Sequence, residues 1–339
     1  MAYPRRLLVA WSQFSVNGGI GRFINVARTL SPFGVEVCFT SISNETQTEW
    51  PDFPRPVLTF REAAEQAWDA VMVPGAGGRN ETLALLAQLK DRRFGTRVQH
   101  VLSDPSRLQR FVVANRAFEP DLVLFNNSQW SPPFPTELHA RRLEVLPGAV
   151  DTDTYYPLPI ERRSEDGMVI GAYAAKNVRP ILRALAALPA SFSACLYGPE
   201  PEDLDQSIAE LGLNQRVSSK GPLFGAGLAN FYRSCDAVVT TELVAGWCNT
   251  AAEAMACGVP VICSHHGTVD FAQHQKTALV LSEVSPETIA GALSRLREDA
   301  NFTRRLAVGG ARLMRSFTWA KYAGRMLEII AGLGPPREH

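Results

Sequence analysis

The sequence of 339 residues has little lysine and no excess of charge of either sign. Lysine occurs at five positions, 90, 176, 220, 276 and 321, and arginine supplies the rest of the 34 basic residues, which balance 34 acidic ones. Without a basic surplus, sequence-independent binding to a nucleic-acid backbone is not expected. Because lysine is scarce, an isolated lysine near glycine, such as Lys176, is a candidate for a specific role.

Long apolar runs and cysteine motifs are also absent. No run of about 18 apolar residues occurs, so no membrane-spanning helix is predicted. The residues from Met1 to Arg6 lead straight into a short apolar run and offer no signal-peptide core, which favours a cytoplasmic location. The six cysteines form no CxxC pair and have no histidine pair at zinc-ligand spacing, so they are interpreted as reduced, small hydrophobic side chains.

Short apolar runs alternate with segments of helical spacing along the whole chain. A first series has runs at 6–11, 35–40, 70–73, 97–102 and 122–125, and a second has runs at 168–173, 193–197, 216–219, 237–240, 259–263 and 278–281. This alternation predicts an α/β fold with two parallel sheets, each covered by helices on both faces. The segment 147–163, rich in Pro, Asp and Thr, is interpreted as the connection between two domains.

A glycine motif lies between the first predicted strand and a helix predicted from Phe23. In Asn17-Gly-Gly-Ile-Gly-Arg-Phe, the glycines allow backbone amides to approach a phosphate at the helix N-terminus, although a tight turn without a ligand explains them equally well. A dinucleotide fingerprint needs a further small residue where Ile24 stands, which disfavours a nicotinamide oxidoreductase. Asp151 and Asp153 resemble a metal-binding pair, but their place in the linker favours an ordinary turn.

The segment 242–262 carries the strongest signal. A strand is predicted to end near Thr241, a loop with Gly246 follows, and a helix begins near Asn249 or Thr250. Free amides at such a helix start lie at the carboxyl edge of the sheet, where α/β folds bind anions and nucleotides. Glu253, one turn into the helix, is placed to accept hydrogen bonds from sugar hydroxyls.

The run Ala-Glu253-Ala-Met-Ala-Cys-Gly-Val-Pro-Val-Ile resembles the signature of the retaining nucleotide-sugar glycosyltransferases of family 4 (glycosyl transferases group 1). Other segments agree in order: 17–21 in the first loop, 127–128 after a strand, 145–157 between the domains and 316–322 at the start of the last helix. The resemblance covers essentially the whole chain. It implies a GT-B fold, in which two Rossmann-like parallel-sheet domains face a central cleft.

The resemblance implies a division of the chain into four parts. Residues 1–150 would form the acceptor-side domain, 151–165 the linker and 166–316 the nucleotide-sugar-binding domain. Residues 317–333 would form a helix that crosses back to the first domain.

The resemblance also implies roles for individual residues. Lys176 matches the family's diphosphate-binding lysine and Glu253 its ribose-binding glutamate. The implied donor-binding set is Gly18, Gly19, Lys176, Arg179, Gly246, Trp247, Cys248, Asn249, Thr250 and Glu253. His100 and Lys176 are the implied catalytic residues, although His100 is equally well explained as an ordinary strand histidine. No metal or other cofactor is implied, because Lys176, Arg179 and backbone amides would supply the positive charge.

Several family positions are occupied by other residues. The family's glutamate eight residues before Glu253 is replaced by Ala245, so its contact with the donor sugar is missing unless Glu242 bends in. The family's arginine after the glycine at 171 is replaced by Ala172. The histidine that commonly precedes Asp104 is replaced by a serine, with His100 three residues before that serine. The interdomain Asn-Gly of the family is Gly-Ala at 148–149 in this chain.

These observations predict a retaining, metal-independent glycosyltransferase that moves a hexose-like sugar from a nucleoside diphosphate to a hydroxyl of a glycan, lipid-linked or small-molecule acceptor. The alternative is a degenerate GT-B protein that binds nucleotide or glycan with little or no transfer. No nucleic-acid partner is expected. The basic amphipathic stretch 107–116 suggests weak peripheral membrane contact, although an ordinary helix covering the sheet explains it too.

Overall fold

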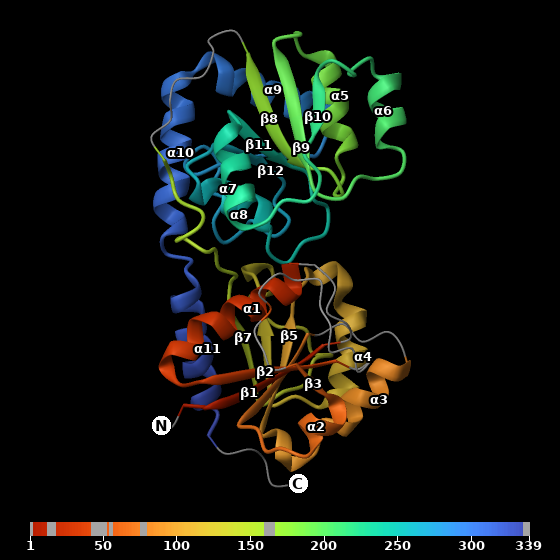
Figure 1. Cartoon of the computed structure of the whole chain (residues 1–339), viewed down its shortest axis with the longest axis vertical. Coiled ribbons are helices and arrows are strands. Elements are labelled where there is room, and N and C mark those ends of the chain that lie inside the picture. The colour runs from red at the N-terminus through yellow and green to blue at the C-terminus, as the bar shows by residue number, and fades with distance from the viewer. Residues whose placement is uncertain are drawn as a thin grey trace. The chain divides into compact units, whose positions relative to one another are not determined.

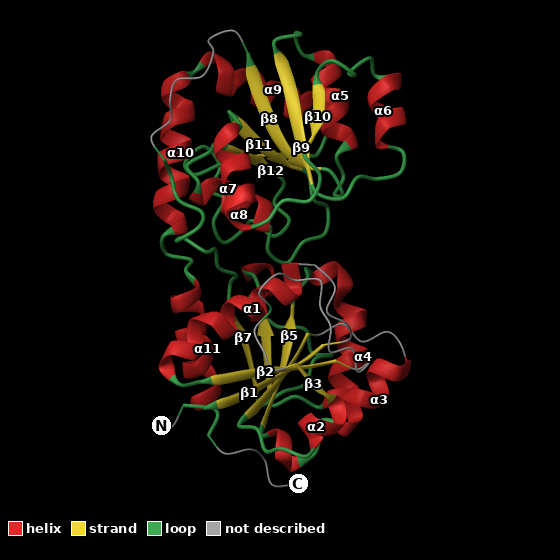
Figure 2. Ribbon diagram, viewed as in Figure 1, coloured by secondary structure: helices red, strands yellow, loops and turns green. Residues whose placement is uncertain are grey.

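The chain folds into two α/β units, shown in Figures 1 and 2. The computed structural model describes residues 3–11, 18–41, 53, 57–74, 80–158 and 167–334. Residues 1–149 and 319–339 form the first unit, and residues 150–318 form the second. Asn17 of the glycine motif and most of the linker beyond residue 158 lie outside the described residues.

The first unit is a parallel sheet with strand order β3-β2-β1-β4-β5-β6-β7 over the described residues. Its strands are β1 (Arg6–Trp11), β2 (Glu36–Ser41), β3 (Val57–Thr59), β4 (Ala70–Pro74), β5 (Thr96–Val101), β6 (Leu122–Phe125) and β7 (Arg142–Val145). Its helices are α1 (Gly18–Leu30), α2 (Phe60–Ala64), α3 (Asn80–Gln88), α4 (Leu108–Phe118) and α11 (Trp319–Ala331).

The second unit is a parallel sheet with strand order β10-β9-β8-β11-β12-β13 over the described residues. Its strands are β8 (Met168–Tyr173), β9 (Phe192–Tyr197), β10 (Val217–Ser219), β11 (Ala237–Thr240), β12 (Val261–Cys263) and β13 (Leu279–Val280). Its helices are α5 (Arg179–Ala187), α6 (Leu204–Glu210), α7 (Gly225–Ser234), α8 (Asn249–Ala256), α9 (Pro286–Glu298) and α10 (Ala300–Met314).

The central strands explain why both sheets are covered on two faces. In β1, Leu7 and Val9 are fully buried in the core shared with α1 and α11, whereas Leu8 and Ala10 are buried in a second core with α3 and α4. In the second unit, neighbouring residues of β11 also face opposite cores, one lined by α5 and α9 and the other by α7 and α8. Strands that are apolar on both faces must be covered on both. The α/β class predicted from the sequence is confirmed.

The structure differs from the sequence prediction in where elements begin and which exist. Helix α1 begins at Gly18, so Gly18 and Gly19 form its first turn and do not belong to a loop before Phe23. The prediction placed the start too late because glycine has low helix propensity. The sequence does not predict strands β3 and β7, because each has at most four residues and is only partly buried. It does not predict helices α6 and α7 either.

Two ambiguous charged segments have ordinary structural roles. Asp151 accepts hydrogen bonds from the backbone amides of Asp153 (3.1 Å) and Thr154 (3.3 Å), so it closes a turn. The basic stretch 107–116 lies largely in α4, which buries Phe111 and Val112 in the first unit. The membrane contact suggested for this stretch stays a prediction.

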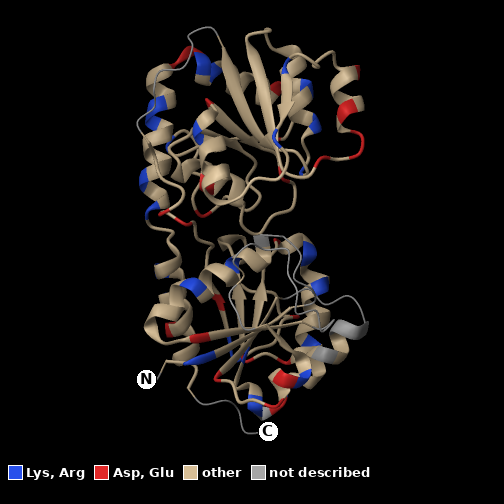
Figure 3. Cartoon of the chain, viewed as in Figure 1, with Lys and Arg blue, Asp and Glu red and all other residues tan. Residues whose placement is uncertain are grey.

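Neither a membrane span nor a field of one charge is evident. Among the described residues, no helix is long and apolar enough to cross a bilayer. Basic and acidic residues are interspersed along the described parts of both units, as Figure 3 shows.

A glycine before β5 tests how tightly the first sheet is packed. Gly95 has φ +56°, and a Cβ added there would lie 2.3 Å from the carbonyl oxygen of Asp69. Gly34 has φ +72° with open space around the same position. We expect Gly95→Ala to lower the free energy of unfolding by about 3 kcal/mol, because backbone strain and a clash add.

The matched change Gly34→Ala introduces the strain alone and should cost about 1 kcal/mol. Urea denaturation of both variants measures the difference. Equal losses for the two would show that the backbone at 95 relaxes at no cost.

Candidate active site in the second unit

Two loops that follow adjacent strands are tied together and position Lys176. Strands β8 and β11 are paired, and Lys176 and Asn177 follow β8 while Thr241 follows β11. The Asn177 side chain donates to the Thr241 carbonyl (2.8 Å), and the Thr241 hydroxyl donates to the Asn177 carbonyl (2.6 Å). Asn177 has φ +49°, a left-handed conformation that asparagine adopts more readily than most residues. The backbone at Lys176 is therefore fixed at the carboxyl edge of the sheet.

Lys176 is paired with Glu242. Its Nζ lies 3.0 Å from both carboxylate oxygens, and the Glu242 side chain is only 5% exposed. Burial acts to lower the pKa of Lys176, but the charge and hydrogen bonds of Glu242 outweigh it, so the pKa is raised. Lys176 thus stays protonated over the physiological range, and Glu242 holds its ammonium group in place.

Helix α8 begins beside this pair. Cys248 is its N-cap residue, and the Cys248 thiol lies 3.7 Å from Glu242 Oε1. The amide of Cys248 donates to the Gly267 carbonyl (2.9 Å) and is thus already used within the protein. The ring of Trp247 packs against Phe271 at 4.7 Å between centroids. The side chains of Trp247 and Cys248 are buried, and the donor contacts predicted for these two residues stay predictions.

A buried tyrosine network holds Glu253. The Tyr232 hydroxyl donates to Glu253 Oε2 (3.0 Å) and lies 2.7 Å from the Tyr197 hydroxyl, which in turn lies 3.0 Å from the Thr250 hydroxyl. Burial raises the pKa of Glu253 to about 8; the Tyr232 hydrogen bond lowers it, and the charge of Asp151 adds to the rise. Near neutral pH the Glu253 carboxyl is therefore largely protonated, and it ionises as the pH rises through about 8.

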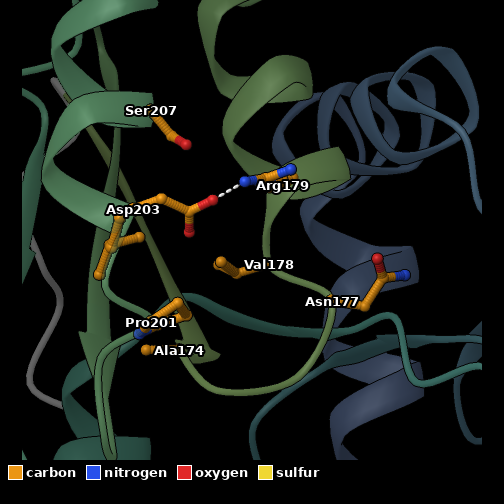
Figure 4. A pocket seen from close by; sticks show the side chains of 8 residues that line it. Ala174, Asn177, Val178, Arg179, Pro201, Asp203 and Ser207 are labelled. Carbon is orange, nitrogen blue, oxygen red and sulfur yellow. Dashed lines mark ion pairs between the residues drawn. The ribbon is translucent and has the colours of Figure 1, made fainter.

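Arg179 lies in a small cavity at the start of α5. It forms an ion pair with Asp203, from the segment before α6, as Figure 4 shows. Asn177 and Ser207 also line this cavity of about 130 Å³. A cavity of this size is smaller than the roughly 300–1,000 Å³ of small-molecule sites. It can accept part of a ligand at most, and the Arg179 charge is already partnered.

Three predicted site residues, Gly18, Gly19 and His100, lie in the first unit, whereas Gly246 and Asn249 lie in the second, in and after the loop that follows β11. His100, on β5, is fully buried, with Nε2 2.5 Å from the Tyr322 hydroxyl. Burial lowers the pKa of His100 well below its ordinary value, and the charge of Arg22 adds to this. The roles predicted for His100, Gly18 and Gly19 stay predictions.

Several residues of this site have no role predicted from the sequence. For Glu242 the sequence suggests only a contact with the donor sugar, and for Tyr232, Asn177 and Asp203 it predicts no role. The one available signal was the position of Glu242, which directly follows a strand at the edge where Lys176 was expected. Among the described residues, no group of three or more His, Cys, Asp or Glu side chains could hold a metal ion.

Comparison with known proteins agrees with this geometry. Residues 166–299 match the family Glycosyl transferases group 1, and this range contains Lys176, Glu242 and Glu253. This match covers less than half of the chain. The resemblance to glycosyl transferases group 1 expected from the sequence is confirmed over these residues, and the retaining, family 4 detail stays a prediction.

Curated relatives match parts of this chain that differ in length. The chain is 31% identical over 133 residues to a D-inositol 3-phosphate glycosyltransferase of Thermomonospora curvata, covering 39% of this chain and 31% of that protein. It is 26% identical to one of Mycobacteroides abscessus, covering 74% of this chain and 57% of that protein. The matches to the first relatives span about a third of those proteins' length.

Solved structures share the fold of the whole chain. Anabaena HepE, in complex with UDP and glucose, has a TM-score of 0.80 at 18% identity, covering 97% of this chain and all of that one. Sucrose-phosphate synthase from Thermosynechococcus elongatus has a TM-score of 0.78 at 17% identity, covering 97% and 99%. Both have the GT-B fold, which is confirmed for this chain.

Proposed function

We propose that this protein is a glycosyltransferase that transfers a sugar from a nucleoside diphosphate donor to an acceptor hydroxyl with retention of configuration. One observation carries the proposal. Lys176, its partner Glu242 and the start of α8 come together at the carboxyl edge of one parallel sheet, and Glu253 lies one turn into α8. That edge is where α/β folds bind phosphorylated ligands.

The arrangement suits the two ends of a nucleoside diphosphate. Lys176 offers a fixed ammonium group to the diphosphate, and the α8 dipole favours negative charge at the same place. Glu253 offers carboxylate oxygens to the ribose hydroxyls. UDP is the first nucleotide to test, because Anabaena HepE is known in complexes with UDP and with UDP-glucose.

In the proposed reaction, the protein stabilises the leaving diphosphate and supplies no nucleophile. Negative charge grows on the diphosphate as the bond to the sugar breaks, and Lys176 is positioned to stabilise that charge. The departing diphosphate oxygen takes the proton of the acceptor hydroxyl, which attacks from the same face. This route does not need a glutamate at position 245, where Ala245 is buried. We propose that no metal ion is required.

A second candidate function is nucleotide or glycan binding without efficient transfer. Two observations favour it: position 245 has no carboxylate to contact a donor sugar, and the charge of Lys176 is already paired with Glu242. A diphosphate would have to share Lys176 with this carboxylate.

The experiment is a calorimetric titration of the protein with UDP and with ADP and GDP, followed by incubation with UDP-glucose and an acceptor panel. We expect UDP to bind, with the same affinity in EDTA, and UDP to be released only when an acceptor is present. Binding without any release favours the second candidate. No binding of any nucleotide would overturn the proposed transferase and leave only glycan binding for the second candidate.

A further inference from the structure

The first unit buries an arginine that no carboxylate neutralises among the described residues. Arg22, in the second turn of α1, is only 5% exposed. Its guanidinium lies 5.3 Å from the centroid of the Tyr322 ring of α11. Its Nη1 is buried without a hydrogen-bond partner. A buried, uncompensated cation is costly to a fold, so a site that retains one commonly serves a ligand.

The surroundings of Arg22 are suited to an anion. Helices α1 and α11 have 13 residues each, and the Arg22 guanidinium, near the start of α1, lies over the Tyr322 ring near the start of α11. Both helix dipoles therefore add positive potential at this edge. His100 Nδ1, like Arg22 Nη1, is buried without a partner, so two polar atoms of the cluster are unsatisfied.

The described residues that contact Arg22 carry no negative charge. The charge of Arg22 contributes to the lowered pKa of His100, so the imidazole is neutral. The pKa of Tyr322 is raised, chiefly by burial, so its hydroxyl is neutral as well. The cluster thus has a net positive charge and two neutral polar rings.

We propose that Arg22, Tyr322 and the N-terminal end of α1 bind an oxyanion of the acceptor substrate, a phosphate or a carboxylate. The assignment to the acceptor rests on the proposed function, because the donor nucleotide is already accounted for by Lys176 and Glu253 in the other unit. The acceptor would then be an anionic molecule, such as a phosphorylated sugar or polyol, held by a guanidinium that binds oxyanions through two parallel hydrogen bonds.

The test uses inorganic phosphate as the probe, titrated calorimetrically into the UDP-saturated protein so that Lys176 is occupied. We expect Arg22→Met to reduce phosphate affinity about tenfold or more, since a charge-assisted, bidentate interaction is lost. Arg110→Met, which removes an exposed arginine of α4 in the same unit, should leave phosphate affinity unchanged. UDP affinity should be the same in both variants.

A melting curve without phosphate separates binding from a structural role. Because the buried charge is uncompensated, Arg22→Met should not lower the melting temperature of the free protein. If Arg22→Met does not fold, Arg22→Lys serves instead. Lysine keeps the positive charge but lacks the two parallel N–H donors of the guanidinium, so phosphate affinity should again fall severalfold.

Three results would overturn the proposal: no phosphate binding to the wild type, phosphate affinity unchanged in the Arg22 variants, or UDP affinity reduced by the same factor as phosphate affinity. The last would assign the oxyanion to the donor. If UDP does not bind at all, the same titration is made on Lys176→Met. A loss caused by Arg22→Met there would support the anion subsite while the proposed function fails.

Discussion

Replacing Lys176 by methionine is expected to reduce the rate of sugar transfer by about 10²- to 10³-fold. The Lys176 ammonium group is fixed by Glu242 at 3.0 Å, at the edge of the sheet where α8 begins. A cation that is already oriented stabilises charge developing on a leaving diphosphate without reorganising. The loss should appear mainly in kcat, with a smaller loss of UDP affinity, because the charge on the diphosphate grows in the transition state.

The control for this change must account for Glu242. Removing Lys176 leaves the Glu242 carboxylate, 5% exposed, without its cation, which destabilises the fold. The double variant Lys176→Met with Glu242→Gln removes both charges and should recover the stability but not the activity. Lys276→Met, at an exposed lysine of the same unit, should change neither. If the double variant regains full transfer, Lys176 does not act on the diphosphate.

UDP affinity is expected to rise about eightfold between pH 7 and pH 8.5, because Glu253 ionises over this range. The pKa of Glu253 is raised to about 8, chiefly by burial. Only the carboxylate can accept hydrogen bonds from ribose hydroxyls at both oxygens without donating a proton, so binding requires the ionised form. Calorimetric titrations with UDP across this range measure the dependence.

Two variants test the assignment to Glu253. Glu253→Gln cannot ionise, and its UDP affinity should be low and independent of pH. Tyr232→Phe removes the hydrogen bond that lowers the pKa of Glu253, so the whole pH profile should move to higher pH. A pH dependence that persists unchanged in Glu253→Gln would show that another group is responsible.

The raised pKa of Glu253 also makes the free energy of unfolding depend on pH. In the unfolded chain Glu253 loses its proton near pH 4.5, whereas in the folded protein it keeps the proton until about pH 8. The folded state therefore binds the proton more tightly, and its stability falls as pH rises from 4.5 through 8. Glu253→Gln removes this loss, so it should gain stability relative to the wild type over that range, as urea denaturation at several pH values would show.

Local patterns in the sequence were enough to predict the architecture. Strands that read as continuous apolar runs, such as Leu7–Ala10, are buried on both faces, and the spacing between runs left room for helices. The segment around Glu253 could be interpreted because its signals are also local: the end of a strand, a glycine and the start of a helix follow one another in the sequence. Glycines at 18 and 19 obscured the true start of α1, because their low helix propensity was outweighed by packing.

The partners of the site residues were decided only by the tertiary structure. Glu242 lies 66 residues from Lys176, and Tyr322 lies 222 residues from His100, and no spacing rule connects groups so far apart. The pairing of β8 with β11 brings the first pair together, and the packing of α11 on the first unit brings the second. Burial, which sets the pKa of Glu253 and isolates the Arg22 guanidinium, likewise arises only when distant segments pack. The sequence by itself therefore determined the fold class and the motif at Glu253, whereas charge pairing and desolvation were decided by contacts between segments far apart in the chain.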